Sequence, residues 1–123
     1  MMAGRGRSNQ RKVGERAETL AKDFLERAGI RIIERNYRFE RGEIDLIGED
    51  GEELVFIEVK ARWSKAFGDP EDAITPQKED QIKKTAEGYL VEHGIEDRAV
   101  RFDVVAITFE GKTRNIRHIK DAF

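Results

Sequence analysis

Two short runs of aliphatic and β-branched residues carry four charged side chains, in surroundings where an isolated charge is costly. These are Glu43 and Asp45 in the run 42–47, and Glu58 and Lys60 in the run 54–60. A charged group in apolar surroundings is unfavourable unless it is paired, hydrogen-bonded or bound to a metal ion. The two runs are therefore the first place to look for a functional site.

The chemistry that these side chains could perform depends on their faces. Side chains alternate along a strand, so Glu43 and Asp45 share one face of the first run. Glu58 and Lys60 likewise share a face of the second. If the two strands pair as a hairpin, Asp45 and Glu58 come close enough to share Mg²⁺ or Mn²⁺. A water held by the ion can serve as a nucleophile, and Lys60 can position it or stabilise charge on a phosphate. The set favours phosphodiester hydrolysis over acyl transfer, for which no nucleophile and base pair is visible.

The same charges have a structural alternative. Asp45 and Glu58 could be neutralised by Lys60, Arg62 or Lys78 without binding a metal ion, because structural ion pairs also gather charges. An ion pair does not, however, require an acid-x-lysine strand beside a strand with its own central aspartate. The joint placement of the residues therefore favours the metal site.

Other polar and aromatic residues are interpreted as structural. Glu43 is either a third acid or a strand-end residue, and the second interpretation is favoured. Asp103 lies in an apolar run and is expected to pair with Arg101 or Arg62. Trp63 is interpreted as a partly buried loop anchor rather than a platform on which a base stacks. The two histidines of the chain are not at ligand spacing, so a zinc site is not indicated.

Apolar spacing predicts the elements that position these side chains. In chain order they are a helix over 13–28, strands over 30–39, 42–47 and 54–60, a helix over 75–93, and strands over 100–108 and 115–120. The fourth strand is apolar on both faces and is expected to be central, whereas the last is edge-like. The order α-β-β-β-α-β-β predicts an α/β domain with a mixed sheet flanked by helices. Its first three strands form an antiparallel meander, and the second helix permits a parallel pairing.

Local features refine this prediction. The segment Gly48–Gly51 is expected to form the turn between the two charged strands. Ile44 and Leu46 are expected to share the face opposite the acids. On the first helix Glu18 lies beside the apolar stripe and could reach the sheet, whereas Glu15 faces solvent.

Composition limits the class of protein. A chain of 123 residues fits one domain with its own core. The absence of cysteine leaves no disulfide, thiolate zinc site or cysteine nucleophile to consider. No apolar run reaches the length of a membrane span, and a cytoplasmic protein without a membrane partner is expected. Residues 1–11 have almost no large apolar side chains and are expected to be a disordered arm, followed by a single domain over 12–123.

The charges of the chain are unevenly distributed although the formal net charge is −2. The first sixteen residues carry five basic side chains, Arg5, Arg7, Arg11, Lys12 and Arg16. Such an arm can bind phosphates with release of counterions, or it can be a solvated tail, and both interpretations stay open. The predicted nucleic-acid contacts are Arg11 at the end of the arm, Lys12 at the start of the domain, and Arg62 and Lys78 near the charged strands.

Five segments of the chain together resemble a known family. They are Gly14-Glu15-x-Ala17-Glu18, Arg35-Asn36-Tyr37, Gly42-Glu43-Ile44-Asp45-Leu46-Ile47, Phe56-Ile57-Glu58-Val59-Lys60-x-Arg62 and Arg101-Phe102-Asp103-Val104-Val105. The pattern resembles the YraN-like family of bacterial proteins of unassigned function. Its central acids and lysine are similar to the PD-(D/E)xK signature of restriction-endonuclease-like nucleases, with isoleucine in place of the signature's proline.

The resemblance implies a restriction-endonuclease-like fold, similar to archaeal Holliday-junction resolvases. It implies a metal site at Asp45 and Glu58, completed by the Val59 carbonyl. It also implies that Lys60 is the catalytic lysine and that Glu18 is the helix-borne acid of resolvase-like members.

The function implied by this likeness is that of an endonuclease that uses Mg²⁺ or Mn²⁺ to cut DNA, including branched or structured DNA. A homodimer would match the paired active sites of resolvases. Two alternatives stay open. The chain could be a nucleic-acid-binding module that retains the nuclease fold without catalysis, or a partner-binding protein that needs neither ligand.

Overall fold

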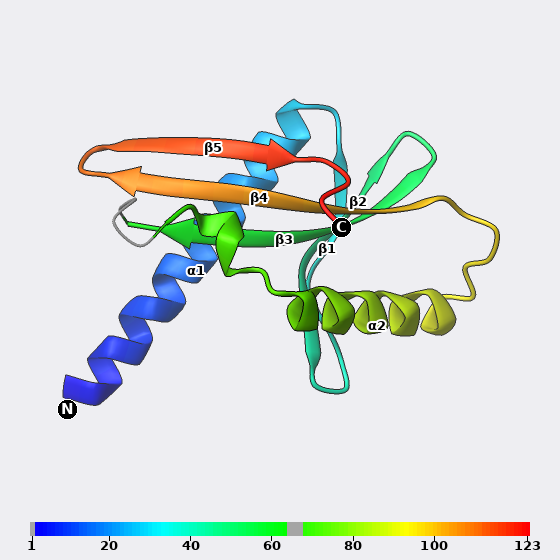
Figure 1. The fold of residues 1–123 in the computed structure, drawn as a ribbon, viewed down its shortest axis with the longest axis horizontal. Helices are drawn as coiled ribbons and strands as arrows, with labels where there is room; N and C mark the ends of the chain where they lie inside the picture. Colours follow the sequence, from blue (N-terminus) through cyan, green and yellow to red (C-terminus); the bar gives the residue numbers. More distant parts are fainter. Residues whose placement is uncertain (1, 64–67) are drawn as a thin grey trace.

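Five strands form one mixed sheet with a helix packed on each face (Figure 1). The structure is a computed structural model that describes residues 2–63 and 68–123, with side chains from residue 14 onward. Its elements are α1 (Met2–Arg27), β1 (Arg31–Phe39), β2 (Gly42–Asp50), β3 (Glu53–Arg62), the 3₁₀ helix η2 (Pro70–Ala73), α2 (Pro76–Glu92), β4 (Val100–Glu110) and β5 (Thr113–Ile119). The predicted α/β class and element order are confirmed.

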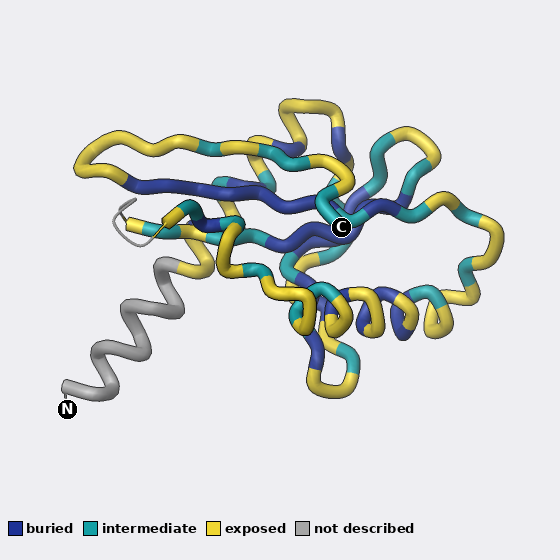
Figure 2. Tube along the Cα trace, viewed as in Figure 1, coloured by how far each residue is buried: buried dark blue, intermediate teal, exposed yellow. Residues whose placement is uncertain are grey.

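The strands lie in the order β1-β2-β3-β4-β5, so neighbours in the sheet are also neighbours among the strands of the chain. β3 and β4 are parallel, with Leu54 opposite Val100, and every other pair is antiparallel. The predicted meander and the parallel crossover through α2 are therefore confirmed. β4 lies inside the sheet and β5 at its edge, which explains why β3 and β4 are buried over much of their length while β5 is largely exposed (Figure 2).

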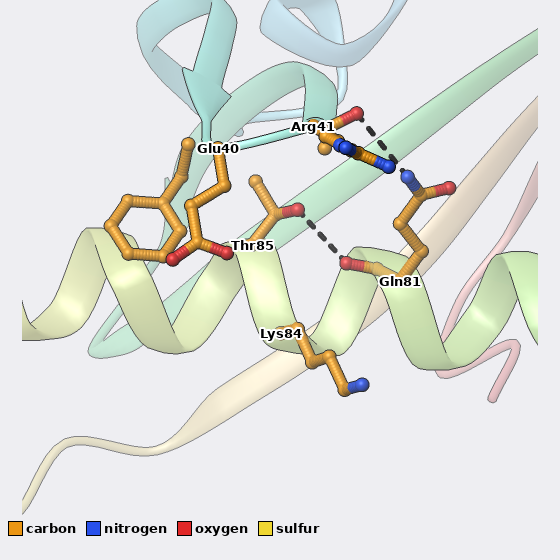
Figure 3. Close-up of a pocket in the computed structure, with 7 residues that line it drawn as sticks. Glu40, Arg41, Gln81, Lys84 and Thr85 are labelled. Atoms are coloured by element: carbon orange, nitrogen blue, oxygen red, sulfur yellow. Dashed lines mark hydrogen bonds between the residues drawn. The ribbon is translucent and has the colours of Figure 1, made fainter.

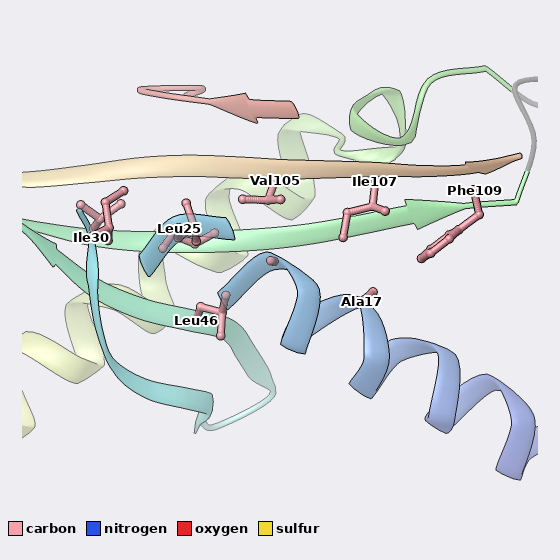
Figure 4. Packing of buried hydrophobic residues seen from close by; sticks show 10 residues of the cluster. Ala17, Leu25, Ile30, Leu46, Val105, Ile107 and Phe109 are labelled. Carbon is pink, nitrogen blue, oxygen red and sulfur yellow. The ribbon is translucent and has the colours of Figure 1, made fainter. Parts of the chain in front are cut away.

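The core has two layers because strand side chains alternate between faces. α1 covers one face, where a cluster of apolar side chains packs beneath it (Figure 4): Ala17, Ala21, Leu25, Ile30, Leu46, Val55, Ile57, Val105, Ile107 and Phe109. α2 covers the other face through a second cluster: Tyr37, Ile44, Ile47, Leu54, Phe56, Ile82, Ala86 and Tyr89. The sheet is thus enclosed on both sides, as apolar strands such as β3 and β4 require.

β2 departs from the alternation that its sequence predicts. Ile44 packs in the α2 cluster and Leu46 in the α1 cluster, so the prediction that they share a face was wrong. Opposite this part of β2, Asn36 of β1 adopts a left-handed backbone with φ of 53°, and the β1–β2 register shifts between Ile32 and Glu34. The break in alternation thus coincides with an irregular stretch of the β1–β2 pairing.

The turn between β2 and β3 is also shorter than predicted. β2 runs on to Asp50, and the tight turn is made by Gly51, with φ of 61°, and Glu52. Gly48 lies within the strand instead of the turn. A side chain would not fit at this position, because a Cβ there would approach the Ile30 side chain to 2.9 Å. The glycine therefore permits the end of α1 and the start of β1 to pack closely on β2.

The first helix is longer than its apolar spacing indicates. Its backbone begins at Met2 and so includes most of the segment 1–11, expected to be a disordered arm. The side chains of residues 1–13 are outside the described part of the structure, and the division into arm and domain stays a prediction. No helix in the described part of the chain is long and apolar enough to cross a membrane.

Gly88 provides a test of the packing of α2 against the β1–β2 hairpin. Replacing a helical glycine by alanine ordinarily stabilises a helix by up to ~1 kcal/mol. At Gly88, however, the new Cβ would lie 2.4 Å from the Phe39 ring. We expect Gly88→Ala to lower the free energy of unfolding by about 1–3 kcal/mol, measured by chemical denaturation.

Gly14 supplies the matched control in α1, because a Cβ there meets nothing within 4 Å. Gly14→Ala should leave stability unchanged or raise it. Equal effects of the two substitutions would contradict the close contact between α2 and Phe39.

Candidate metal site

The candidate site lies where β2 and β3 part beneath α1. The β2–β3 ladder runs from Asp50–Glu53 to Leu46–Ile57. Beyond Leu46 and Ile57 the backbone pairing stops, and the Val59 N–H donates instead to the side chain of Asp45, with 2.8 Å between Val59 N and Asp45 Oδ2. A cavity of about 350 Å³ opens at this point, lined by Gly14, Ala17, Glu18, Asp45, Glu58, Val59, Lys60 and Ala61. The cavity thus brings together the predicted acids of α1, β2 and β3 and the predicted lysine.

Three carboxylates converge at this opening. Glu18, Glu43 and Asp45 each offer one ligand oxygen, and these oxygens lie within 4.8 Å of one another. Glu43, which was favoured as a strand-end residue, therefore belongs to the acid group. Its period-two spacing from Asp45 was the signal that could have included it.

Asp45 and Glu58 lie close enough for each carboxyl group to affect the pKa of the other, as their predicted hairpin placement required. Burial raises the pKa of Glu58 to about 8, with a further contribution from the Asp45 charge. Burial also raises the pKa of Asp45, although the hydrogen bond from Val59 opposes the shift. The pair consequently retains a proton on Glu58 near neutral pH, and two negative charges are not forced together in the cavity.

Two lysines face this pair. Lys60 Nζ lies 3.6 Å from Glu58 Oε1, and its side chain is 28% exposed. The positive charges of Lys60 and Lys78 both oppose the rise in the Glu58 pKa, so Lys78 acts on the site from the first turn of α2. The structural ion pair considered for Lys60 is thus present.

The remaining predicted nucleic-acid contacts are Arg62, Arg11 and Lys12. The Arg62 side chain at the end of β3 is half-buried, and its Nε has no hydrogen-bond partner among the described residues. Arg11 and Lys12 have side chains outside the described residues, so their contacts stay a prediction.

Two arginines of β1 border the acids on the opposite side. Arg35 lies 3.8 Å from Glu18 Oε2, and Arg38 lies 3.7 Å from Glu43 Oε2. The pKa of Glu18 is nevertheless raised, chiefly by burial and then by the Asp45 charge. Sequence reasoning did not identify either arginine, because β1 meets these acids only after the sheet and α1 have packed.

The sequence model of the uncharacterised protein family UPF0102 matches residues 17–107, a span that includes every acid of the cavity. The chain belongs to this family. It corresponds to the YraN-like family that the sequence motifs resemble.

Relatives carry the match over nearly the full chain. A UPF0102 protein of Geotalea daltonii is 46% identical over 123 residues, which cover 99% of this chain and 97% of the relative. A UPF0102 protein of Geobacter sulfurreducens is 44% identical over 124 residues, covering 100% and 97% of the two chains. One from Nitrosococcus oceani is 46% identical over 117 residues, or 94% of each chain. The names of these relatives state the family and no activity.

A larger cavity of this UPF0102 member, about 520 Å³, lies between the β1–β2 hairpin and α2 (Figure 3). Its hydrogen bonds are structural: Gln81 Nε2 donates to the Arg41 carbonyl at 3.2 Å, and Thr85 Oγ1 donates to the Gln81 carbonyl at 2.9 Å. Glu40 is the only carboxylate among its lining residues. The smaller cavity beneath α1, which is lined by three carboxylates and a lysine, is therefore the better candidate for a functional site.

The second acid network of this UPF0102 member is saturated without a ligand. Arg101 donates two hydrogen bonds of 2.9 Å to Asp103, His118 Nε2 lies 2.7 Å from Asp103 Oδ2, and the Asp121 N–H donates at 3.0 Å. Burial alone would raise the pKa of Asp103, but the bonds to His118 and Arg101 hold it at about 2. The predicted structural pairing of Asp103 with Arg101 is confirmed.

The raised pKa of Glu58 makes the stability of the metal-free protein depend on pH. The folded chain binds this proton more tightly than the unfolded chain, because the pKa rises from 4.5 to about 8 on folding. The associated stability is fully present below the unfolded pKa and is lost as pH rises through the folded one. We expect the free energy of unfolding in EDTA to fall by a few kcal/mol between pH 5 and 9, at about 1.4 kcal/mol for each pKa unit.

A Glu58→Gln variant should remove most of this decline, since glutamine does not titrate. Thermal or urea unfolding of both proteins across the pH range gives the measurement. Parallel pH profiles for the two proteins would show that Glu58 does not hold the proton.

Proposed function

We propose that this protein is a nuclease that uses a divalent cation to hydrolyse phosphodiester bonds of DNA, with branched or structured DNA among its substrates. One observation carries the proposal: oxygens of Glu18, Glu43 and Asp45 converge within 4.8 Å beside the buried Asp45–Glu58 pair. Carboxylates at such distances repel one another unless a proton or a cation compensates them. The likeness to the PD-(D/E)xK signature supports the same assignment.

The donor set fits a hard cation. Mg²⁺ and Mn²⁺ prefer oxygen ligands, and one to three carboxylates with retained waters are typical of Mg²⁺ sites. Asp45 would hold the ion together with Glu58 once that residue releases its proton, and Glu18 and Glu43 add negative charge beside them. The Val59 carbonyl is a further proposed ligand, from the family likeness. A bound cation would supply an activated water and charge stabilisation for a phosphate.

The basic side chains around the acids have proposed roles of their own. Lys60 lies beside Glu58 and is partly exposed, so its ammonium can stabilise negative charge that develops on the phosphate. Arg35 and Arg38 border the acids from β1 and can hold the flanking backbone phosphates. Lys78 adds positive charge from α2.

Removing and restoring the cation tests the proposal. Purified protein is incubated with linear duplex, single-stranded and four-way-junction DNA, in EDTA and then with Mg²⁺ or Mn²⁺. We expect cleavage of at least one substrate only with the cation, and saturable Mn²⁺ binding by calorimetry. Absence of both metal binding and cleavage would refute the proposal.

Lys60→Gln separates binding from catalysis. The substitution removes the ammonium but none of the acids, so Mn²⁺ binding should persist while cleavage falls by about 10²–10³-fold. Equal loss of metal affinity and cleavage would instead assign Lys60 to the assembly of the site.

A DNA-binding module without catalysis is the second candidate. Its support is that Glu58 does not need a metal ion for compensation, because its raised pKa of about 8 lets it keep a proton and Lys60 Nζ lies 3.6 Å from its carboxyl group. This candidate predicts binding to DNA that weakens steeply with salt, with no uptake of Mn²⁺. The calorimetric titration distinguishes it from the nuclease.

A further inference from the structure

An exposed aromatic stack borders the candidate site. Trp63 follows the last residue of β3 and is 57% exposed, although tryptophan is usually well buried. Its ring stacks on Phe109, with centroids 4.6 Å apart and planes inclined by 29°. Phe109 is only 5% exposed and belongs to the core cluster beneath α1 (Figure 4). A buried ring thus supports an exposed one.

The stack lies on the same face of the sheet as the site cavity. Ala61 lines the cavity, and Trp63 follows two residues later, a separation of about 7 Å along a strand. The contact with Phe109 fixes Trp63 on the face that α1 covers. Trp63 therefore stands beside the cavity, one strand repeat beyond its lining.

A positively charged side chain, Arg16, lies next to the aromatic stack. The Arg16 guanidinium lies 6.0 Å from the centroid of the Phe109 ring, within cation–π range. Arg16 belongs to the turn of α1 that contributes Gly14 and Ala17 to the cavity lining. An exposed ring and a positive charge thus lie together beside the cavity, which is the combination that single-stranded DNA recognition uses.

From this arrangement we propose that Trp63 stacks on an unpaired base of the substrate, so that DNA with single-stranded segments next to the site is the preferred class. The inference rests on the proposed function, because it takes DNA as the ligand. The bases of an intact duplex are stacked on one another and offer no free face, whereas every unpaired base does. Phe109 holds the Trp63 ring in one orientation, which lowers the entropy lost when a base stacks on it.

The intrinsic fluorescence of the protein tests the contact directly, because the chain has one tryptophan. The protein is titrated in EDTA with a single-stranded oligonucleotide and with a blunt duplex of equal length. Anisotropy of labelled DNA measures binding in parallel. We expect the single strand to quench Trp63 emission, and the duplex to leave it unchanged at equal occupancy.

Substitutions measure the contribution of the ring to affinity. Trp63→Ala should weaken binding of single-stranded and flapped DNA by about tenfold or more and leave duplex affinity unchanged. Trp63→Phe should retain most of the affinity, since it keeps an aromatic face. Phe24→Ala, at a residue of α1 that is 36% exposed, is the matched control and should change neither affinity.

Several outcomes would overturn the stacking proposal. These are no binding of single-stranded DNA, equal quenching by duplex, or equal loss of both affinities in Trp63→Ala. The nuclease proposal fails separately: quenching without metal-dependent cleavage would refute catalysis and leave the stacking contact standing. Cleavage without quenching would do the reverse.

Discussion

An Asp45→Asn variant is expected to lose divalent-cation binding and DNA cleavage together, with cleavage reduced by more than about 100-fold. Asp45 belongs to the three converging carboxylates, and its charge also helps to raise the pKa of Glu58. Asparagine has the same shape and can still accept the hydrogen bond from the Val59 N–H. The substitution therefore removes charge while the opening between β2 and β3 is preserved.

Calorimetric titration with Mn²⁺ and a cleavage assay on the preferred DNA measure the two losses. Asp80→Asn, an exposed position on α2, is the control for the change of net charge. Thermal unfolding should show both variants folded. Wild-type cleavage by folded Asp45→Asn would exclude this site as the catalytic centre.

The second large effect is expected at Asp103, away from the candidate site. Asp103→Asn should lower the free energy of unfolding by about 2–4 kcal/mol, because it leaves Arg101 and His118 without their shared anionic partner. The side chain of Asp103 is 0% exposed, so water cannot replace the lost bonds. Mn²⁺ affinity should be unchanged at temperatures where the variant is folded.

The pH dependence of this effect has the opposite sign to that of Glu58. The pKa of Asp103 is lowered from 3.8 to about 2, so its stabilisation is present above the unfolded pKa. It is lost as pH falls from about 4 toward 2. Glu53→Gln is the control, because that side chain meets the same Arg101 at 3.2 Å but is 44% exposed, and should cost under ~1 kcal/mol. Equal costs at the two positions would contradict a buried network.

The strand acids could be paired from the sequence because their arrangement is local. Asp45 and Glu58 lie on consecutive strands joined by a tight turn, and an antiparallel hairpin brings them together when its register places their polar faces on the same side. The class of fold followed from the same patterns, since two helices alternate with runs of strand. Glu18 was accessible to this reasoning because helical spacing identifies which face is buried.

Other features depended on contacts between distant segments. Ile44 and Leu46 pack on opposite faces of the sheet beside the left-handed Asn36 of β1, and strict alternation of side chains does not predict this irregularity. Gly48 resembled a turn residue, yet its role is to admit Ile30 against the strand. The exposure of Trp63 likewise depends on which core ring lies behind it. Tertiary packing decided each of these cases.

The residues of the candidate site and the strand that supports them lie far apart in the sequence, because β3 pairs with the distant strand β4. The acids and Lys60 all occur within residues 18–60, whereas Val105 and Ile107 of β4 form part of the apolar floor on which α1 rests. Leu54 and Val100, 46 residues apart, must meet before that floor exists. Closing so long a loop is slow compared with forming a hairpin. During synthesis the acids therefore leave the ribosome well before β4, and we expect the arrangement of the three carboxylates beneath α1 to form only as a late event of folding.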